Sequence, residues 1–441
     1  MNKFEKILLT IFLIELFVGG GGRLIDFGVI SIRQVLFILL ILTYIYRVIK
    51  EKAYTNKAIN TFFRRDPVTV GIYLLIGWFF VSAVIGYCNG NTPSIILMDF
   101  FRVSFFAAYF PLAYYVSEER YSKQRIITLL KYCAFFVAVF TMLLALLGKT
   151  MYSSNFELYK QFWKHLMNDD LLFRRSHSVF YKSHFYVFIG LVLSLNAVLS
   201  KKFLKIDLLN IPLCFISIFW SDTRGFFIAL MVSILMIVII DVKLIITPVK
   251  GMAEKIKTMS KNSQLLIKSA VLLMITFSVP YLYQYLTLER FEQSTEAHNH
   301  IKNGAVNDTS VGARVEFLIA SKEKLLSNPV HFIFGEGYGT SIAGRVEGIE
   351  MSFLDIWVEQ GAIGLGMWVF LCLLVIYNYN SGHKNGMEIT TEDVSLVGAF
   401  VGVVLLTNIN PFINNPIGIS FFLLILIFSK QIKNKQRWNP I

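Results

Sequence analysis

The hydrophobic positions of this chain fall into long runs that polar segments separate. A membrane-spanning helix needs about 20 mainly apolar residues, with a range of about 17–25. Runs near this length recur along the whole sequence and predict about twelve spans, which makes an all-α, polytopic integral membrane protein the expected fold class. We place the spans at residues 4–18, 30–47, 68–87, 98–116, 126–147, 184–200, 206–220, 226–246, 265–286, 353–377, 394–409 and 416–429.

The composition agrees with this prediction. Hydrophobic residues make up 55% of the 441 and charged residues only 16%, whereas a soluble domain carries about 25% charged residues. The net charge of +13 would suggest nucleic-acid binding in a soluble protein. In a membrane protein, lysine and arginine set the topology instead, and no basic run here is interleaved with exposed aromatic residues. We therefore expect a lipid bilayer as the environment and no nucleic-acid partner.

The distribution of lysine and arginine predicts the orientation. With the N-terminus inside, most of the 42 fall on the inner side, as the positive-inside rule requires. Both termini are then cytoplasmic, and residues 1–441 form a single membrane domain. Two segments on the outer side are long, 148–183 and 287–352, whereas the inner loops are too short for a catalytic domain. Any active site is therefore expected outside, and residues 287–352 are expected to carry part of it.

Arginines gather on the predicted outer side, against the topological trend. Their planar forks match phosphate oxygens, which points to a lipid-linked phosphate or an acidic polymer as the ligand. Each arginine can instead snorkel or pair with a nearby carboxylate. The substrate-binding candidates are Arg102, Arg345, Arg174 and Arg175.

Two of the arginines have an informative local context. Asp99 and Arg102 are three residues apart within a predicted span, so they can meet on one helix face, and both pairing and substrate contact stay open. Arg224 follows a very tight turn between two spans and stands at the start of a helix, where anions also bind. A structural pair between Asp222 and Arg224 is the alternative.

The second long outer segment supplies further candidates. An amphipathic stretch at 313–326 carries Arg314. The glycines at 335, 337 and 339 look like a phosphate loop, but no strand precedes them and no Lys-Ser/Thr follows, so we expect a turn that returns the chain to the membrane. Glu350 lies at the mouth of the next span, where a carboxylate beside an apolar surface suits general-base chemistry or pairs with an arginine. No carboxylate accompanies the outer histidines at metal-ligand spacing, so no metal site is expected.

Three segments, in this order, resemble the bacterial O-antigen ligase and Wzy-type polysaccharide polymerase superfamily. Residues 221–225 look like the family's Ser-x-Ser-Arg-Gly hairpin, residues 314–339 like its large outer loop, and residues 350–361 like its return into the membrane. The ligases usually carry a histidine at this return, with a glycine eleven positions later. Glu350 and Gly361 stand at those places here, which favours the polymerase branch.

The resemblance implies a membrane glycosyltransferase with a GT-C-like fold that needs no metal or other cofactor. Its donor would be a glycan on undecaprenyl diphosphate, and its acceptor the terminal sugar of another lipid-linked repeat. Glu350 would be the base, and Arg224 and Arg314 would stabilise the departing diphosphate. The protein would lie in the bacterial plasma membrane with its active site on the outer face. A chain-length regulator in the membrane is a candidate partner.

Two other functions stay open from the sequence. An O-antigen ligase would join a finished polymer to a lipid acceptor. A flippase or other transporter of lipid-linked sugars would need charges along a path near the middle of the bilayer. Most of the unusual charges lie at the predicted outer rim instead, which favours the polymerase.

Overall fold

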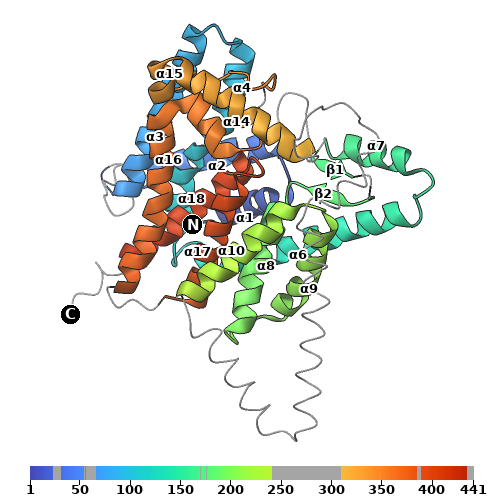
Figure 1. Ribbon diagram of the computed structural model, residues 1–441. Coiled ribbons are helices and arrows are strands. Elements are labelled where there is room, and N and C mark those ends of the chain that lie inside the picture. Colours follow the sequence, from blue (N-terminus) through green and yellow to red (C-terminus); the bar gives the residue numbers. More distant parts are fainter. Residues whose placement is uncertain are drawn as a thin grey trace, which may run out of the picture.

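The chain folds into helices almost throughout, as its apolar runs predict (Figure 1). The computed structural model describes residues 1–22, 31–53, 55, 66–168, 170–174, 176–240, 309–346, 348–384 and 389–434. The helical elements are α1 (Lys3–Val18), α2 (Ile32–Lys50), α3 (Pro67–Cys88), α4 (Pro93–Ser104), η1 (Phe105–Ala108), α5 (Tyr109–Tyr115), α6 (Lys123–Lys149), α7 (Phe156–Leu166), α8 (His184–Leu199), α9 (Lys205–Trp220), α10 (Arg224–Ile240), α14 (Thr309–Ser327), α15 (Pro329–Phe334), α16 (Ser352–Lys384), α17 (Thr391–Leu406) and α18 (Pro416–Asn434).

The predicted spans coincide with these helices wherever the structure describes them. The span predicted at 98–116 corresponds to α4, η1 and α5, which follow one another directly. Among the described residues, five helical segments are long and apolar enough to cross a membrane, and three apolar helices are shorter. The prediction of a multi-pass membrane protein is confirmed. The span at 265–286 lies outside the described residues, so the count of about twelve and the GT-C-like arrangement stay predictions.

Local sequence signals explain where the helices begin. Asp66 caps α3 by accepting a hydrogen bond of 3.0 Å from the backbone N–H of Thr69, and Pro67 occupies the first helical position. Thr390 and Asp393 form a reciprocal capping box at the start of α17. These caps satisfy backbone donors that have no partner within the helix.

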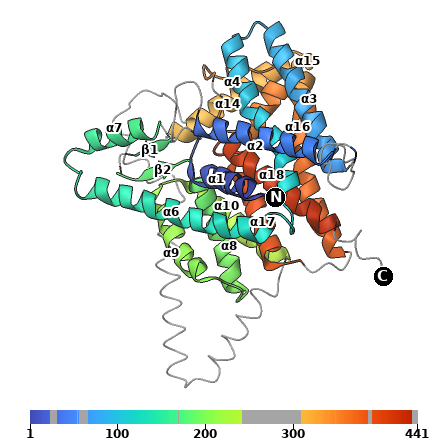
Figure 2. The same ribbon diagram turned by 180° about the vertical axis from the view of Figure 1, so that it is seen from behind.

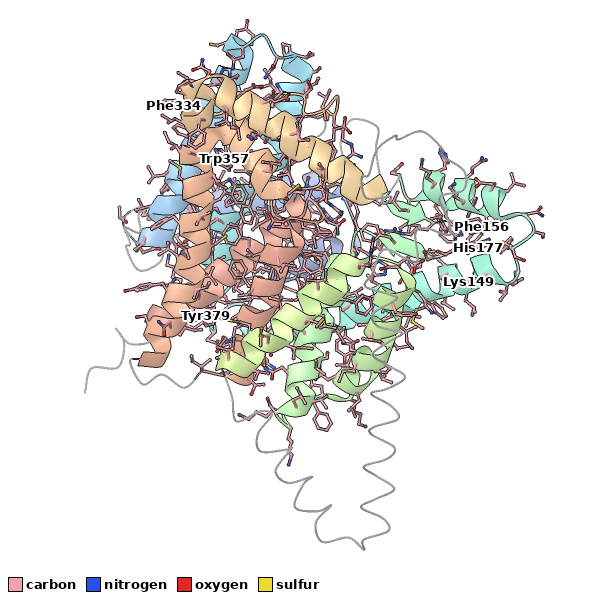
Figure 3. The ribbon with its side chains drawn as sticks, viewed as in Figure 1. Lys149, Phe156, His177, Phe334, Trp357 and Tyr379 are labelled. Carbon is pink, nitrogen blue, oxygen red and sulfur yellow. The ribbon has the colours of Figure 1, made fainter. Side chains whose placement is uncertain are left out.

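The segment 148–183, predicted to be the first long outer loop, departs from the all-α prediction. It contains α7 and an antiparallel hairpin of β1 (Leu171–Phe173) and β2 (Val179–Tyr181), with Leu171 opposite Tyr181. Both strands are short runs of large apolar residues joined by a turn, which is too little chain for a helix and enough for a hairpin. Figure 3 shows Phe156 of α7 beside His177 in the turn, and their rings are 4.0 Å apart between centroids.

The interior consists of two groups of helices in contact. Helix α8 is buried along most of its length, and α6, α9, α10 and α17 pack around it. Helix α16 packs on α3 and α18, where Trp368 stacks on Phe422 with 6.1 Å between ring centroids. Figures 1 and 2 place α14, α15 and the turn between α3 and α4 together at one end of the molecule.

The outward faces of several helices are apolar. Leu42 on α2 and Phe80 and Val84 on α3 are exposed, as expected of side chains that face lipid. Figure 3 shows Trp357 and Tyr379 toward opposite ends of α16, and aromatic residues of this kind are common at both surfaces of a bilayer.

Candidate active site

The start of α16 is anchored on the segment that joins α17 to α18. The backbone N–H of Ser352 donates to the carbonyl oxygen of Thr407 at 3.0 Å, and the Ser352 hydroxyl donates to Oδ1 of Asn414 at 2.9 Å. Both side chains of that second bond are fully or almost fully buried. These bonds hold Glu350, two positions before α16, against residues 407–414.

Two predicted arginines meet Glu350 at this point. Arg314, near the start of α14, has its Nη2 3.2 Å from Oε2 of Glu350, and the same nitrogen donates to the carbonyl oxygen of Ile409 at 3.2 Å. Nη1 of Arg345 lies 3.9 Å from the other carboxylate oxygen, Oε1. The Glu350 side chain keeps 34% of its surface exposed. The structure therefore brings together three predicted site residues around a carboxylate that solvent can reach.

Arg345 is positioned by α14 as well as by its own turn. Its guanidinium lies above the Phe317 ring, 5.2 Å from the ring centroid. At this distance the aromatic face attracts the cation. Its backbone exchanges hydrogen bonds with Ile342, and Gly344 between them adopts a left-handed φ of 78°. This tight turn directs Arg345 back toward Glu350.

Arg224 stands beside the same segment, at the first residue of α10. A Cβ added to the next residue, Gly225, would lie 3.0 Å from the side chain of Ile409, so α10 begins directly against the segment that Arg314 contacts. Arg174, which directly follows β1, also reaches this place, and its Nη2 lies 3.3 Å from the Thr223 hydroxyl. Arg175 lies outside the described residues.

Asp222, the alternative structural partner of Arg224, ties the turn before α10 to the β1–β2 hairpin. Asp222 adopts a left-handed φ of 51° in the tight turn, and its carboxylate accepts a hydrogen bond of 2.5 Å from the Ser176 hydroxyl. These contacts dock the hairpin of β1 and β2 on the turn that precedes α10. This docking places Arg174 next to the predicted site.

Arg102 is surrounded by carboxylates in the protein interior. Its Nη2 lies 3.3 Å from Asp99, as the spacing on one helix face predicts, and 3.6 Å and 2.9 Å from Asp355 and Glu359 of α16. Gly348 covers this cluster, because a Cβ there would be 2.8 Å from Nη1 of Arg102. The cluster thus lies directly beneath the segment that ends at Glu350.

The two arginine sites differ in charge balance. At Glu350, two arginines share one carboxylate, and Arg224 begins a helix nearby. At Arg102, three carboxylates surround one arginine. An added phosphate is attracted to the first site and repelled by the second. The geometry therefore favours Arg314 over Arg102 as a ligand of a diphosphate, while the role of each residue stays a prediction.

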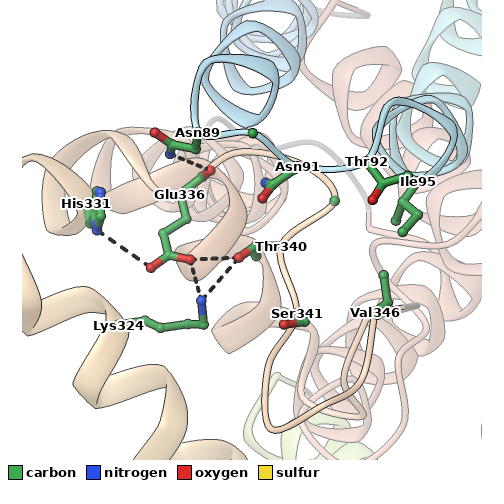
Figure 4. Close-up of a pocket in the computed structure, with 12 residues that line it drawn as sticks. Asn89, Asn91, Thr92, Ile95, Lys324, His331, Glu336, Thr340, Ser341 and Val346 are labelled. Atoms are coloured by element: carbon green, nitrogen blue, oxygen red, sulfur yellow. Dashed lines mark hydrogen bonds and ion pairs between the residues drawn. The ribbon is translucent and has the colours of Figure 1, made fainter.

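Sequence reasoning missed a second polar region beside this site. The turn at Asn89–Thr92 between α3 and α4 and the residues Lys324, His331 and Glu336 line one pocket (Figure 4). These residues come from opposite halves of the chain, so no local pattern links them. The spacing of glycines at 335, 337 and 339 was the one available signal, because it marks a close backbone approach.

The comparison with known proteins adds the decisive observation. No family model matches this chain. The chain is 24% identical to the O-antigen polymerase of Shigella flexneri over 451 aligned positions, which cover 100% of this chain and 99% of that protein. This full-length similarity supports a relationship to the Wzy-type O-antigen polymerase family. This relationship supports a polysaccharide polymerase role and a glycosyltransferase-like enzyme, and it agrees with the branch that Glu350 favours.

Proposed function

We propose that this protein polymerises a polysaccharide by transferring a glycan from undecaprenyl diphosphate to the terminal sugar of another lipid-linked repeat. The observation that carries the proposal is the meeting of Arg314 and Glu350 beside Ile409 and the start of α10. Cations for a diphosphate and a carboxylate for a hydroxyl then stand within one site. The full-length similarity to an O-antigen polymerase supports the same reaction class.

The arginines would act on the leaving group. As the bond between the anomeric carbon and the phosphate oxygen breaks, its electron pair passes to undecaprenyl diphosphate. A diphosphate leaves without being protonated, so cations that stabilise the growing negative charge are sufficient. Arg314 and Arg224 would supply this stabilisation, and no metal enters the proposed step. Arg174 and Arg345, on either side, would extend the positive surface along the diphosphate or the glycan.

Glu350 would act on the acceptor. The hydroxyl oxygen of the acceptor sugar attacks the anomeric carbon, and its proton passes to the Glu350 carboxylate. Oε2 is engaged by Arg314 at 3.2 Å, whereas Oε1 has the more distant Arg345 at 3.9 Å. We therefore assign Oε1 as the oxygen that accepts the proton. Holding two lipid-anchored substrates in one orientation lowers the barrier further.

We also propose the setting of the reaction. The protein would lie in the bacterial plasma membrane with both termini in the cytoplasm and the Glu350 site on the outer face, as the positive-inside rule predicts. Both substrates would reach the site from the outer leaflet of the bilayer. A chain-length regulator in the same membrane would be the protein partner.

Deletion of the gene, followed by gel analysis of surface and lipid-linked glycans, tests the proposal. The expected result is a single repeat on the lipid core with no longer chains. Loss of polymer from the core while polymer stays on undecaprenyl diphosphate would overturn the proposal in favour of a ligase. Repeats trapped on the inner face would overturn it in favour of a flippase.

A further inference from the structure

A pocket of about 580 Å³ opens beside the proposed catalytic residues, between the α3–α4 turn and the segment after α15 (Figure 4). This volume lies within the range of about 300–1,000 Å³ that is typical of small-molecule sites. Its polar lining includes Asn89, Asn91, Thr92, Lys324, Glu336 and Ser341. None of these residues belongs to the site around Glu350.

Backbone contacts build one wall of this pocket. The side-chain amide of Asn89 donates to the carbonyl oxygen of Glu336 at 3.0 Å, and that of Asn91 donates to the carbonyl oxygen of Tyr338 at 2.9 Å. Gly337 between them has a φ of 81°, and an added Cβ would overlap the backbone of Gly86. The α3–α4 turn and the glycine-rich segment are therefore joined across a distance of some 250 positions in the sequence.

Lys324 and Glu336 in the pocket lining pair with one another, and Nδ1 of His331 lies 3.6 Å from Oε1 of Glu336. Nζ of Lys324 lies 2.6 Å from Oε2 of Glu336, which also accepts a hydrogen bond of 2.7 Å from the Thr340 hydroxyl. Burial raises the pKa of the Glu336 carboxyl, but the hydrogen bonds from Lys324 and Thr340 outweigh burial and hold that pKa below its ordinary value. The pair is thus ionised and neutral overall, whereas at Glu350 two arginines face one carboxylate among the residues that the structure describes.

The pocket also offers hydroxyl groups and apolar edges to a ligand. The Thr92 side chain makes no capping hydrogen bond to α4, and the exposed Ser341 hydroxyl bonds to no other residue in the part of the chain that the structure describes. Ile95 and Val346 add apolar surface. A sugar ring combines hydroxyl groups around its edge with C–H groups on its faces, so it matches this lining. A free phosphate or diphosphate matches it less well, because the lysine among the described lining residues is paired with Glu336.

The position of the pocket connects it to the reaction. Val346 lines the pocket, and its neighbour Arg345 lies 3.9 Å from Glu350. The pocket lining and the site around Glu350 are therefore adjacent along the chain, at Val346 and Arg345. We propose that this pocket binds a sugar of the lipid-linked glycan, away from the bond that forms. The choice of a glycan rests on the proposed function, whereas the choice of a neutral, hydroxyl-rich ligand rests on the lining alone.

Binding of the glycan without turnover tests this inference. The probe is the repeat oligosaccharide released by mild acid from the host's own lipid-linked repeats, added to the purified full-length protein. Saturation-transfer NMR or calorimetry measures its Kd. Thr92→Trp and Ser341→Trp each place an indole ring in the pocket. Each should weaken oligosaccharide binding at least about tenfold, because the filled pocket leaves no room for the sugar ring. The double variant T92A/S341A removes only hydroxyls and should weaken binding several-fold.

Two comparisons make the result specific. Ser154→Trp adds the same side chain at an exposed outer turn and should bind the oligosaccharide as the wild type does. Undecaprenyl diphosphate without a glycan should bind to all these variants equally. Unchanged oligosaccharide binding in both tryptophan variants would overturn the pocket assignment. Failure of the proposed function would show instead as the ligase or flippase glycan pattern in the deletion strain. That result does not depend on what the pocket variants bind.

Discussion

Glu350 contacts two arginines, and the two contacts are not equivalent. Arg314 is three-quarters buried, lies 3.2 Å from the carboxylate and also binds a backbone carbonyl, whereas Arg345 is half exposed and lies 3.9 Å away. An ion pair in an enclosed, hydrogen-bonded setting contributes more than one that solvent screens. At the scale of single residues, Arg314 therefore carries more of the proposed chemistry than Arg345.

The first prediction compares these two arginines. Arg314→Lys keeps the charge but loses the planar guanidinium, whose Nη2 contacts both Glu350 and Ile409. We expect polymer formation to fall by about 10²-fold or more, the scale seen when a donor to a developing anion is removed. Arg345→Lys should stay within about tenfold of the wild type, since exposed pairs contribute about 0–1 kcal/mol. Rates on purified lipid-linked repeats check both, and equal effects would contradict the assignment.

The second prediction concerns Glu350. Glu350→Gln keeps the shape and removes the basicity, and general-base catalysis contributes about 10²–10⁴-fold. We expect polymerisation to slow at least about a hundredfold, with donor binding largely retained. Glu323→Gln, at an exposed position on α14, is the matched control. A Gln variant with near wild-type turnover would contradict this role and direct attention first to Asp26, which lies outside the described residues, and next to Asp355.

The third prediction concerns the pH dependence of stability at Glu336. Its pKa in the folded protein lies below the ordinary value of 4.5, so its ion pair stabilises the fold above that pH and loses this effect as the pH falls through the folded pKa. Glu336→Gln should lower the Tm at pH 7, since a hydrogen bond to a charged group contributes about 1.5–3 kcal/mol. Thermal unfolding in detergent should show the difference from wild type shrinking below about pH 4.5. A difference that is constant with pH would show that the charge is not its cause.

At the scale of elements, the end of α15 and a kink in α16 fit together through two glycines. Gly361 interrupts α16 with a φ of 68°, and a Cβ there would lie 2.3 Å from the carbonyl oxygen of Ile333. A Cβ on Gly335 would in turn lie 2.6 Å from the backbone nitrogen of Gly361. This contact sets the angle at which the segment carrying Glu336 leaves α15.

The fourth prediction follows from this contact. Gly361→Ala forces a side chain into a left-handed conformation, which costs about 1–3 kcal/mol, and into backbone that cannot yield. We expect a clear fall in Tm and in the yield of folded protein. Gly366→Ala is the matched control, because it lies in the same helix with open space around its added Cβ, and alanine favours helix by about 1 kcal/mol over glycine. A tolerated Gly361→Ala would contradict the close approach.

At the scale of the whole molecule, the fifth prediction is the orientation in the membrane. In a Cys88→Ser background, which removes the exposed native thiol, Ser154→Cys should react with an impermeant thiol reagent in cells whose outer membrane is permeabilised. Lys202→Cys should react only after lysis, because its loop follows α8 on the predicted inner side. Both positions are exposed. The reverse pattern of labelling would place the Glu350 site on the inner face.

The sequence by itself determines the helix positions and indicates the main candidate residues. Both are read from residues that lie close together along the chain. An apolar run of sufficient length must satisfy its backbone hydrogen bonds within itself in a bilayer, so it forms a helix wherever it lies. The pair of Asp99 and Arg102 is equally local, and the structure confirms it. The order and spacing of three segments, 221–225, 314–339 and 350–361, are equally a property of the sequence and carry the resemblance to the family.

The grouping of those residues into sites was decided only by the tertiary structure. Arg314 meets Glu350 because residues 407–414 anchor the start of α16, and Asp355 and Glu359 reach Arg102 because α16 packs in the interior near α4. The polar pocket joins Asn89 to Glu336 through one side-chain amide. Such contacts depend on how distant helices pack, and packing follows the shape and volume of many side chains at once rather than any local pattern.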